Sequence, residues 1–494
     1  MRIPERVVIR YLGSVPNGWT EVFQNHSLQL GAAPDVPALI KACDDGARAI
    51  IVPFQNSQNS ASQRDFVKIN NAIGEHAANR GTLVIVAVAN TAMLRNDLLW
   101  LTTATTDTNA REENYVRPYI KELDSPHPAA ELAELCRRHH PGPQLNKNTA
   151  FKRKGMRTIP IPGETLLSRA FLDYSKLTVS PLHGGRSIAK DVWHVTARDG
   201  NRFAATPFVV KMGPLEIVET ELNNFEDMIM DSVPFPYRPP TIKDRCVSGK
   251  TQRLLVTKFI ADAVELEDYI LKTEPTAAVN LLFDGPLSNW RKQSRPERMQ
   301  LALEYAKHWV LPSLPADLAN LNAAFLGAQR IVKDILDPSA MLKALNGLPK
   351  TRVRACRAHG DLHLRNIFVR QFSGEAMLID FARCTGQAPS TFDPSTLDVA
   401  LAFDLPSGQP NFTLEALGRL YSVPLLGTKH LVSGRYKHRL AAIKQVRKRA
   451  AELVVDTREY DISVACRLLW FSRKFKNPTT YFCANRIVKD LTKK

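Results

Sequence analysis

The stretch HGDLHLRNIFVRQFSGEAMLIDFARC, residues 359–384 of this 494-residue sequence, decides how the second half of the chain folds. Its first eight residues include His359, Asp361, His363 and Asn366. An apolar run at residues 376–379 then leads to one more acid, Asp380. The apolar segments IFVR and AMLI predict a hairpin of two short strands. Such a hairpin would place Asn366 and Asp380 side by side.

The side chains of this stretch suit the handling of a metal ion and a phosphate. Mg²⁺ takes a few hard oxygen ligands and completes its shell with water and phosphate oxygens, so Asn366 and Asp380 are candidate metal ligands. Asp361 would accept or orient the proton of an attacking hydroxyl group. It would act mainly through its position, because an aspartate with an ordinary pKa of about 4 is a weak base. We expect His359 to stabilise the loop by hydrogen bonding to the backbone.

A lysine and an acid upstream complete the candidate site. Lys211 ends the apolar strand PFVVK, so its ammonium group would project from a rigid element toward phosphate oxygens. A carboxylate on the following helix is expected to hold this lysine, with Glu221 as the first choice and Glu219 as the second. Gly184 and Gly185 would let the backbone approach a ligand closely, although two glycines also mark a plain hairpin.

Composition narrows the class of protein. With 44% hydrophobic and 23% charged residues, the chain is typical of soluble globular proteins. No apolar run approaches the roughly 20 residues of a membrane-spanning helix, and the first ten residues lack the apolar core of a secretory signal. Seven scattered cysteines form no CxxC pair, which argues against a zinc ribbon or a disulfide framework. We expect a cytoplasmic protein with reduced thiols and no membrane partner.

Positive charge is concentrated near the end of the sequence. The formal net charge is +17, and residues 429–494 hold 17 Lys and Arg against 5 Asp and Glu, a surplus of +12. Such a surplus either forms solvated basic helix faces or binds an anionic partner, namely nucleotide phosphates, a nucleic acid or an acidic protein. Binding to a nucleic acid or an acidic partner would fall steeply with salt.

Residues 1–125 alternate between strand and helix patterns. Short apolar strands are predicted at 6–12, 48–54 and 82–90, and helices at 33–46 and 62–81. Short apolar strands between helices indicate a parallel sheet with both faces covered, which binds ligands beyond its carboxyl edge, here near Asn56 and Asn90. The layout resembles a receiver-like or flavodoxin-like domain. Where receivers carry a phosphoacceptor Asp, this chain has VPFQN, so we expect a sensing or docking domain that binds a protein partner.

The rest of the chain divides into three further segments. Residues 126–164 are predicted to form a helix and a basic linker, since QLNKNTAFKRKGMRTIPIPG carries two Ile-Pro pairs. Residues 165–262 give strands broken by glycines and by the hairpin signal DGN, together with a helix at 214–230. Residues 263–494 are mostly helical except around 359–382. A small β-rich lobe before a larger helical lobe predicts an α+β fold.

Three motifs carry a family resemblance. HGDLHLRNIFV, then LIDFARC, then DPSTLDVA resemble the aminoglycoside phosphotransferase and choline kinase branch of the protein-kinase-like superfamily over roughly residues 165–494. That branch typically shows H-G-D-L-H-x-x-N, an I-D-F strand and an Asp-Pro…Asp-Leu-Ala segment. The resemblance implies a two-lobed kinase-like fold with Asp361 as the catalytic aspartate. It also implies that Asn366 and Asp380 bind the metal and that Lys211 binds the phosphates.

The resemblance assigns two further positions. Asp398 would be a structural acid that braces the catalytic loop. Residues 258–262, which include Phe259, would form the hinge beside the adenine of ATP. His363 stands where protein kinases usually carry a lysine, and Ala382 replaces the glycine of their Asp-Phe-Gly, which favours a small-molecule kinase. The extra front domain is similar to those of kinase-like proteins fused to signalling or conflict-system modules in bacteria.

Together these features predict an ATP- and Mg²⁺-dependent phosphotransferase that moves the γ-phosphate to a hydroxyl acceptor, which we expect to be a small molecule. The alternative is a catalytically silent kinase-like module that binds nucleotide and regulates a partner. The sequence contains no G-x-x-x-x-G-K-[ST] motif, no G-x-S-x-G elbow and no H-E-x-x-H helix. A Walker-type nucleotidase is therefore excluded as a rival.

Overall fold

A computed structural model provides the structure of the chain. It describes residues 8–45, 47–54, 82–88, 119–123, 125–138, 148–182, 191–200, 202–203, 206–248, 252–300, 302, 315–404, 412–427 and 436–493. The chain divides into two compact units, which are described separately below. The first unit comprises residues 1–220 and 240–259, and the second comprises residues 221–239 and 260–494. Helices and strands are mixed in both, as an α+β fold requires.

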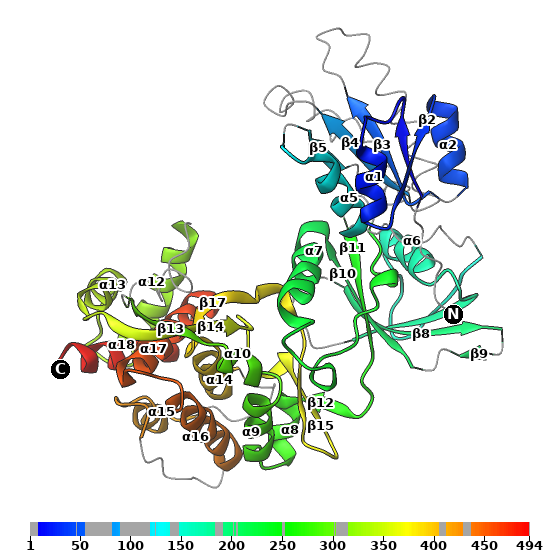
Figure 1. Cartoon of the computed structure of the whole chain (residues 1–494). Helices are drawn as coiled ribbons and strands as arrows, with labels where there is room; N and C mark the ends of the chain where they lie inside the picture. Colours follow the sequence, from blue (N-terminus) through cyan, green and yellow to red (C-terminus); the bar gives the residue numbers. More distant parts are fainter. Residues whose placement is uncertain are drawn as a thin grey trace. The chain divides into compact units, whose positions relative to one another are not determined.

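The first unit begins with a parallel sheet (Figure 1). Its five strands lie in the order β2 (Gln29–Ala33), β1 (Val8–Leu12), β3 (Ala49–Phe54), β4 (Leu83–Val88) and β5 (Tyr119–Glu122). All four pairings are parallel. The predicted parallel sheet is therefore confirmed. The order 2-1-3-4-5 is that of flavodoxin-like folds, while a receiver-like role stays a prediction.

Both faces of this sheet are covered. Helices α1 (Trp19–Asn25) and α5 (Pro128–Arg138) bury residues against one set of strand side chains, and α2 (Val36–Asp44) packs against the other set. Helix α2 begins where the sequence predicts, because the Asp35 carboxylate accepts the Ala38 N–H at 2.9 Å. Strand β2, QLGAA, has no apolar run and was not predicted. The predicted helix at 62–81, Asn56 and Asn90 lie outside the described residues.

A second sheet follows in the first unit. Its main path is β11 (Gln252–Lys258), β10 (Phe208–Pro214), β8 (Asp191–Asp199), β7 (Lys176–Pro181) and β6 (Ala150–Arg153), and β9 (Arg202–Phe203) pairs with β8. The DGN signal is confirmed as the β8–β9 hairpin, with Asp199 opposite Arg202. The linker prediction was wrong for residues 150–153, which pair in parallel with β7, and for the residues that begin α6 (Ile161–Ala170). Two Ile-Pro pairs suggested a linker, but a proline is also favourable in the first turn of a helix.

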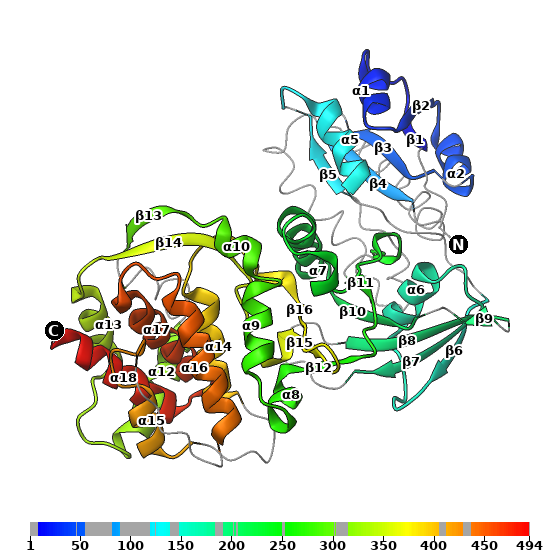
Figure 2. The same ribbon diagram turned by 60° about the horizontal axis from the view of Figure 1, so that its bottom comes forward.

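Helices dominate the second unit (Figures 1 and 2). They are α8 (Leu266–Lys272), α9 (Thr276–Asp284), α10 (Ser288–Lys292), α12 (Pro315–Gln329), α13 (Pro338–Gly347), α14 (Phe392–Phe403), α15 (Leu414–Leu420), α16 (Lys437–Ala451), α17 (Thr457–Phe475) and α18 (Pro478–Thr492). Helix α7 (Leu215–Asn224) spans the division between the units and continues as a π-helical turn, Phe225–Ile229. No helix in the described part of the chain is both long and apolar enough to cross a membrane.

Two three-stranded sheets lie among these helices. One has the order β12 (Ala263–Glu265), β15 (Ile367–Arg370) and β16 (Ala376–Leu378), and the other has the order β13 (Arg295–Gln300), β14 (Thr351–Ala358) and β17 (Thr385–Pro389). The second sheet corrects the prediction that residues beyond 265 are helical except around 359–382. The alternation in TRVRACRA was a strand signal, since Thr351, Val353 and Ala355 are buried while Arg352 and Arg354 are exposed.

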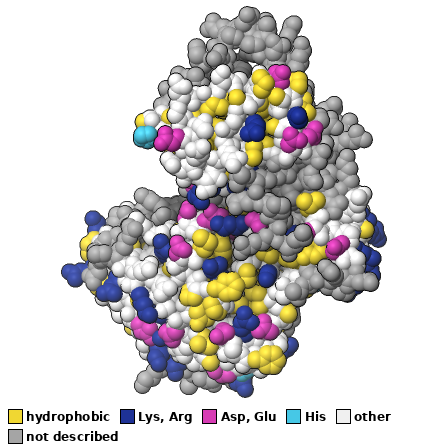
Figure 3. Space-filling model, turned by 45° about the vertical axis from the view of Figure 1, so that its right-hand side comes forward, with side chains coloured by type: hydrophobic (Ala, Val, Ile, Leu, Met, Phe, Trp, Pro, Cys, Tyr) yellow, Lys and Arg dark blue, Asp and Glu magenta, His cyan; other side chains and the backbone are white. Residues whose placement is uncertain are grey.

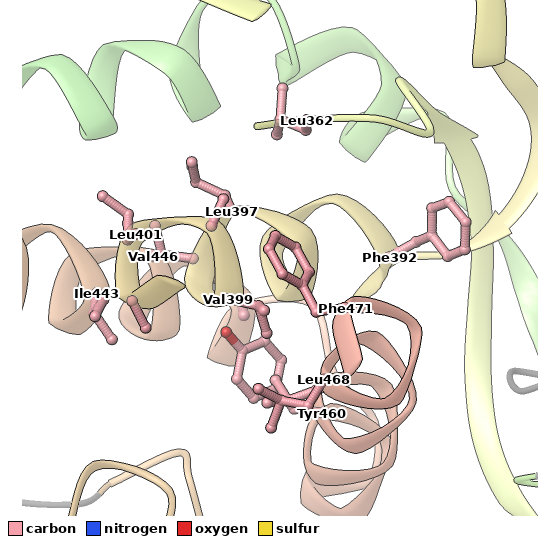
Figure 4. Close-up of a cluster of buried hydrophobic side chains, with 14 of the residues drawn as sticks. Leu362, Phe392, Leu397, Val399, Leu401, Ile443, Val446, Tyr460, Leu468 and Phe471 are labelled. Atoms are coloured by element: carbon pink, nitrogen blue, oxygen red, sulfur yellow. The ribbon is translucent and has the colours of Figure 1, made fainter. Parts of the chain in front are cut away.

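The core of the second unit surrounds α14. Residues 392–402 of this helix are all buried, so the helix packs against neighbours on every side. Figure 4 shows side chains from α14, α16 and α17 that fill this core, including Leu397, Val446 and Leu468. Because α14 is held on all sides, a functional group on its first turn has a fixed position.

Candidate active site

The loop of residues 359–366, which carries Asp361, is anchored by an acid on the first turn of α14. The carboxylate of Asp393 accepts the backbone N–H of His359 at 2.8 Å and that of Gly360 at 3.1 Å. The Asp393 side chain is buried, and this burial raises the pKa of the carboxyl while the two N–H donors oppose the rise. The loop that precedes Asp361 is therefore tied to the most enclosed helix of the unit.

The resemblance had assigned this bracing role to Asp398, and that assignment was wrong. Asp398 is fully buried and accepts hydrogen bonds from Arg447 Nε at 2.7 Å, from Tyr460 at 2.8 Å and from Tyr421 at 3.2 Å. It links α14 to α16, α17 and the end of α15. Five residues along a helix correspond to a rotation of about 140°, so Asp398 points away from the side on which Asp393 meets the loop.

His359 fixes the other side of the loop. Its ring Nε2 lies 2.8 Å from the carbonyl oxygen of Ile379, which confirms the predicted hydrogen bond to the backbone. The Phe381 ring lies 5.6 Å from the His359 ring and 6.1 Å from the Phe225 ring, measured between centroids. The geometry gives His359 a positioning role, since its ring bonds to the backbone beside Asp380.

A residue that the sequence did not indicate holds the segment after Asp380. The side-chain amide of Asn224 donates to the carbonyl oxygens of Phe381 at 3.0 Å and Ala382 at 3.1 Å. Asn224 sits in ELNNFED, where an asparagine at the end of a helix is usually a capping residue. Its contact 157 residues away along the chain has no local sequence signal.

The predicted hairpin brings the two candidate metal ligands together. Strands β15 and β16 are antiparallel with Ile367 opposite Leu378, and the Ile379 N–H donates to the Asn366 carbonyl oxygen at 3.1 Å. The side-chain amide of Asn366 donates to the Asp361 carbonyl oxygen at 2.9 Å, which orients the amide group. Asp380 directly follows Ile379, so the hairpin prediction is confirmed.

Asp380 has an unusual backbone conformation. Its φ of 61° and ψ of 74° lie in the left-handed region, which few residues other than glycine adopt and in which aspartate is enriched. Strained backbone of this kind concentrates at functional sites, because the surrounding structure must over-determine it. Here the surrounding structure is the β15–β16 hairpin on one side and the Asn224 contact on the other.

The donor set fits Mg²⁺ held together with a nucleotide. Asn366 contributes one side-chain oxygen and Asp380 contributes a carboxylate, which is the small number of protein ligands that Mg²⁺ takes when phosphates complete its shell. Within the residues that the structure describes, no group of three or more His, Cys, Asp and Glu side chains is arranged to hold a metal ion by itself. The pair therefore suits a metal that arrives with its phosphate ligands.

Asp361 lies in a strongly cationic environment. Arg467 Nη2 is 3.5 Å from one carboxylate oxygen and Arg383 Nε is 3.8 Å from the other. Burial by itself would raise the pKa of Asp361, but Arg467, His363 and Arg383 outweigh it and the pKa is lowered. The carboxylate is therefore ionised throughout the neutral range.

Close packing places Arg383 beside the loop of residues 359–366. Gly360 has a φ of 80°, and a Cβ on it would lie 2.0 Å from the Arg383 carbonyl oxygen. Glycine is required here for both its conformation and its lack of a side chain. The approach brings the Arg383 side chain to Asp361.

The residues predicted to contact the nucleotide lie partly in the first unit. Lys211 is in the middle of β10, opposite Leu255 and Val192, and the strand continues to Pro214. The prediction that Lys211 ends its strand was therefore wrong, although its rigid support remains. Phe259 directly follows β11, and its N–H donates to the Pro207 carbonyl oxygen at 2.9 Å.

Glu221 and the two glycines are placed differently. Glu221 is a buried residue of α7 on the second unit's side of the division, so its pairing with Lys211 stays a prediction. The second choice, Glu219, lies 3.8 Å from Arg253 in the first unit. Gly184 and Gly185 lie outside the described residues.

Part of the basic surplus in residues 429–494 is internal. Arg439, Arg447 and Arg467 are buried, and Arg439 donates to the carbonyl oxygens of Leu401 and Ala402. On the face drawn in Figure 3, Lys and Arg side chains lie among acidic and hydrophobic ones. An acidic or nucleic-acid partner for the exposed remainder stays a prediction.

Comparison with known proteins adds one family match. A family model described as ternary complex associated domain 9 matches residues 328–477, which include the loop of residues 359–366, Asp393 and α17. The matched stretch is less than half of the chain. No curated protein sequence matches the chain.

The solved structures similar to this chain include several phosphotransferases. A type VIII aminoglycoside-3'-phosphotransferase is 15% identical, with 54% of this chain and 92% of that chain covered and a TM-score of 0.27. Ethanolamine kinase from Plasmodium vivax is 12% identical, with 62% and 80% covered and a TM-score of 0.30. An aminoglycoside phosphotransferase from Streptomyces rimosus is 14% identical, with 59% and 92% covered and a TM-score of 0.31. Similarity at this level carries no conclusion about activity.

Proposed function

We propose that this chain is an ATP- and Mg²⁺-dependent phosphotransferase that moves the γ-phosphate of ATP to the hydroxyl group of a small-molecule acceptor. The observation that carries the proposal is the convergence of Asp361, Asn366 and Asp380. Asp361 lies on the loop, and Asn366 and Asp380 lie at the two ends of the β15–β16 hairpin. Asp393 and His359 hold the loop and the hairpin in place. Phosphoryl transfer needs this kind of positioning more than it needs covalent chemistry from the protein.

Asp361 acts on the acceptor. Its ionised carboxylate orients the acceptor hydroxyl and takes its proton as the oxygen–phosphorus bond forms. The bond between the γ-phosphorus and the bridging oxygen breaks, and ADP leaves with that electron pair. The Asn366 side chain, which bonds to the Asp361 carbonyl, couples the position of the acceptor base to that of the metal ligands.

Asn366 and Asp380 hold the metal, and Lys211 with Glu221 as its acid partner contacts the phosphates. The bound Mg²⁺ supplies positive charge that neutralises the phosphate oxygens. In this proposal the nucleotide is contacted by Phe259, Gly184 and Gly185. Burial lowers the pKa of the His363 imidazole, although the nearby Asp361 carboxylate opposes this shift.

The rival function is a silent module that binds nucleotide and regulates a partner. The observation that favours it is the pair of guanidinium groups within 3.8 Å of the Asp361 carboxylate, which would restrain the proton acceptor. In either case we propose that the parallel-sheet domain docks a protein partner and that the chain works in the cytoplasm.

Replacement of the proton acceptor separates the two functions. Asp361→Asn keeps the size of the side chain and removes the charge, so transfer should fall by about 10²-fold or more while Mg²⁺–ATP binding persists. Asp268→Asn, an exposed acid on α8, removes the same charge as a matched control. Transfer to a panel of hydroxyl acceptors and ATP binding by calorimetry are measured for all three proteins. Equal, non-zero transfer in wild type and Asp361→Asn would refute the role of Asp361, and zero transfer with ATP binding in all three favours the silent module.

A further inference from the structure

We infer that the acceptor of this phosphotransferase carries an anionic group, a phosphate or a carboxylate, close to the hydroxyl that is phosphorylated. The inference rests on the proposed function, because it takes Asp361 as the residue that contacts the acceptor hydroxyl. Whatever lies around Asp361 then faces the acceptor. The side chains there are cationic, and they come from two separate elements of the second unit, the turn Phe381–Arg383 and the end of α17.

Two of these cations are accessible to a ligand. The Arg383 side chain is 46% exposed while its Nε lies 3.8 Å from the Asp361 carboxylate. Lys474 is exposed near the end of α17, and its ammonium group interacts electrostatically with Asp361, Arg383 and Arg467. These two groups present positive charge to any molecule whose hydroxyl reaches Asp361.

Aromatic rings fix the position of the positive charge. The Lys474 ammonium lies 4.5 Å from the centroid of the Trp470 ring and 5.3 Å from that of Phe475. The Arg467 guanidinium lies 4.0 Å from the Trp470 ring. Cation–π contacts of this kind hold long side chains in one place without neutralising them. Arg467 and Lys474, both near the end of α17, are therefore preorganised cations beside Asp361. Together with Arg383 they form what we call the cationic wall.

Arg383, Arg467 and Lys474 all interact electrostatically with Asp361. Arg467 also interacts with the buried Asp393, which already accepts the N–H groups of His359 and Gly360. Asp404 also acts on Lys474, but its carboxylate lies 3.5 Å from Arg365, which in turn binds Glu267. Desolvation by the surrounding protein and the two guanidinium groups lower the pKa of Lys474 despite Asp361 and Asp404. An anion from the acceptor would relieve this repulsion.

Cationic acceptors fit this wall poorly. An amino sugar or a quaternary ammonium compound needs carboxylates or open aromatic faces around its charge. Here Asp361 has a guanidinium group beside each of its two carboxylate oxygens. The Trp470 ring is covered by Arg467 and Lys474. The same cations would bind a phosphate or carboxylate group with charge-assisted hydrogen bonds.

The experiment compares acceptors of different charge on the full-length chain. Glucose 6-phosphate and gluconate represent phosphate and carboxylate acceptors, glucose is neutral, and glucosamine is cationic. With ATP and Mg²⁺, transfer is expected to the anionic compounds, and the better of the two identifies the source of the anion. Transfer that favours glucose or glucosamine overturns the inference but leaves the proposed function intact.

Variants of Lys474 show where the anion binds. Lys474→Gln should raise the KM of the anionic acceptor about tenfold or more, with kcat within about threefold and the KM of ATP unchanged, because a charge-assisted hydrogen bond is lost. Lys474→Arg should retain the wild-type KM. Lys448→Gln, an exposed lysine of α16, removes an equal charge and should have no effect. An acceptor KM that does not change in Lys474→Gln overturns the inference.

Binding without turnover gives an independent readout. Glucose 6-phosphate and gluconate should each bind in calorimetry, less tightly to Lys474→Gln than to Lys448→Gln. If no acceptor is phosphorylated but this difference is found, the anion site stands and the proposed function fails. If neither compound binds, or if both variants bind them equally, the inference itself is wrong.

Discussion

Asp393 accepts the backbone N–H of His359 at 2.8 Å, so a buried acid on α14 holds the loop that carries Asp361, the proposed proton acceptor. Asp393→Asn keeps the shape but presents an NH₂ group to one of the two N–H donors. The unfolding free energy should fall by about 1.5–3 kcal/mol, as for a lost hydrogen bond to a charged group. Transfer should fall about 10²-fold, because Asp361 moves relative to the acceptor. Denaturant titration and steady-state transfer check the two effects.

Asp398→Asn is the matched control for this prediction. Asp398 is equally enclosed in α14 but bonds to Arg447, Tyr421 and Tyr460 rather than to the loop. This variant should also be less stable, yet the transfer rate of its folded fraction should stay within about threefold of wild type. A normal rate in Asp393→Asn, or equal losses in both variants, contradicts the assignment of the bracing role to Asp393.

Gly360 tests the close approach of the loop to Arg383. In Gly360→Ala the new methyl group would meet the Arg383 carbonyl oxygen at 2.0 Å, so the loop or the turn after Asp380 must move. We expect transfer to fall by about 10²-fold, since displacement of a reacting group by about 1 Å costs that much. Gly386→Ala on β17 is the control, because nothing lies within 4 Å of its added Cβ. Wild-type rates in both variants would show that the approach is dispensable.

The candidate site was predictable from sequence where its signal is local. His359, Asp361, Asn366 and Asp380 fall within one loop and one hairpin, and turn and strand patterns over 22 residues determine how these come together. Asn224 was not predictable, because its partners Phe381 and Ala382 are brought to it only by the packing of α7. Local pattern carries no information on such long-range pairs.

The same reasoning explains the error over Asp398. Two acids, Asp393 and Asp398, lie five residues apart in FDPSTLDVA, and either could have faced the loop. The choice depends on the rotation of α14 about its axis, which a helix that is buried on every side does not reveal in its sequence. In the fold, the β13–β14–β17 sheet was missed because its edge strand RPERMQ is polar, although β14 alternates clearly.

The metal site can be tested through Asp380. Asp380→Asn replaces a charged oxygen ligand by a neutral one, so the concentration of Mg²⁺ needed for half-maximal stabilisation by ATP should rise about tenfold or more. Thermal shift at fixed ATP over a Mg²⁺ series measures this directly. Asp490→Asn, near the end of α18, removes the same charge as a control. Superimposable Mg²⁺ curves for wild type and Asp380→Asn would make Asp380 a structural residue.

Lys211 tests the contribution of the first unit to nucleotide binding. Lys211→Ala should weaken ATP binding about tenfold or more, because a charge-assisted contact with phosphate oxygens is lost, while the melting temperature changes little. Lys176→Ala on β7 is the control, since this lysine is exposed in the same sheet. Calorimetric titration with ATP and Mg²⁺ measures both variants. Unchanged ATP affinity in Lys211→Ala contradicts its role at the phosphates.

Arg467 controls the ionisation of Asp361. Its guanidinium is 1% exposed and lies 3.5 Å from the carboxylate, and with His363 and Arg383 it lowers the pKa of Asp361 against the effect of burial. The folded-state pKa is thus below the unfolded value. The ion pair therefore stabilises the fold above the ordinary pKa of an aspartate, about 4, and this stabilisation is lost as pH falls through the lower, folded-state value.

Arg467→Met removes this charge and keeps an apolar stem beside Trp470. The pKa of Asp361 should rise, because burial then opposes its charge with only Arg383, His363 and Lys474 facing it. Since transfer needs the ionised carboxylate, the acid side of the pH–rate profile should shift to higher pH, whereas Arg467→Lys should keep the wild-type profile. Arg458→Met, an exposed arginine of the same helix, is the control for the lost charge. If Arg467 has only a structural role, Arg467→Met would yield less folded protein, but its pH–rate profile would not move. An unshifted acid side of the profile would therefore contradict the proposal that Arg467 keeps Asp361 ionised.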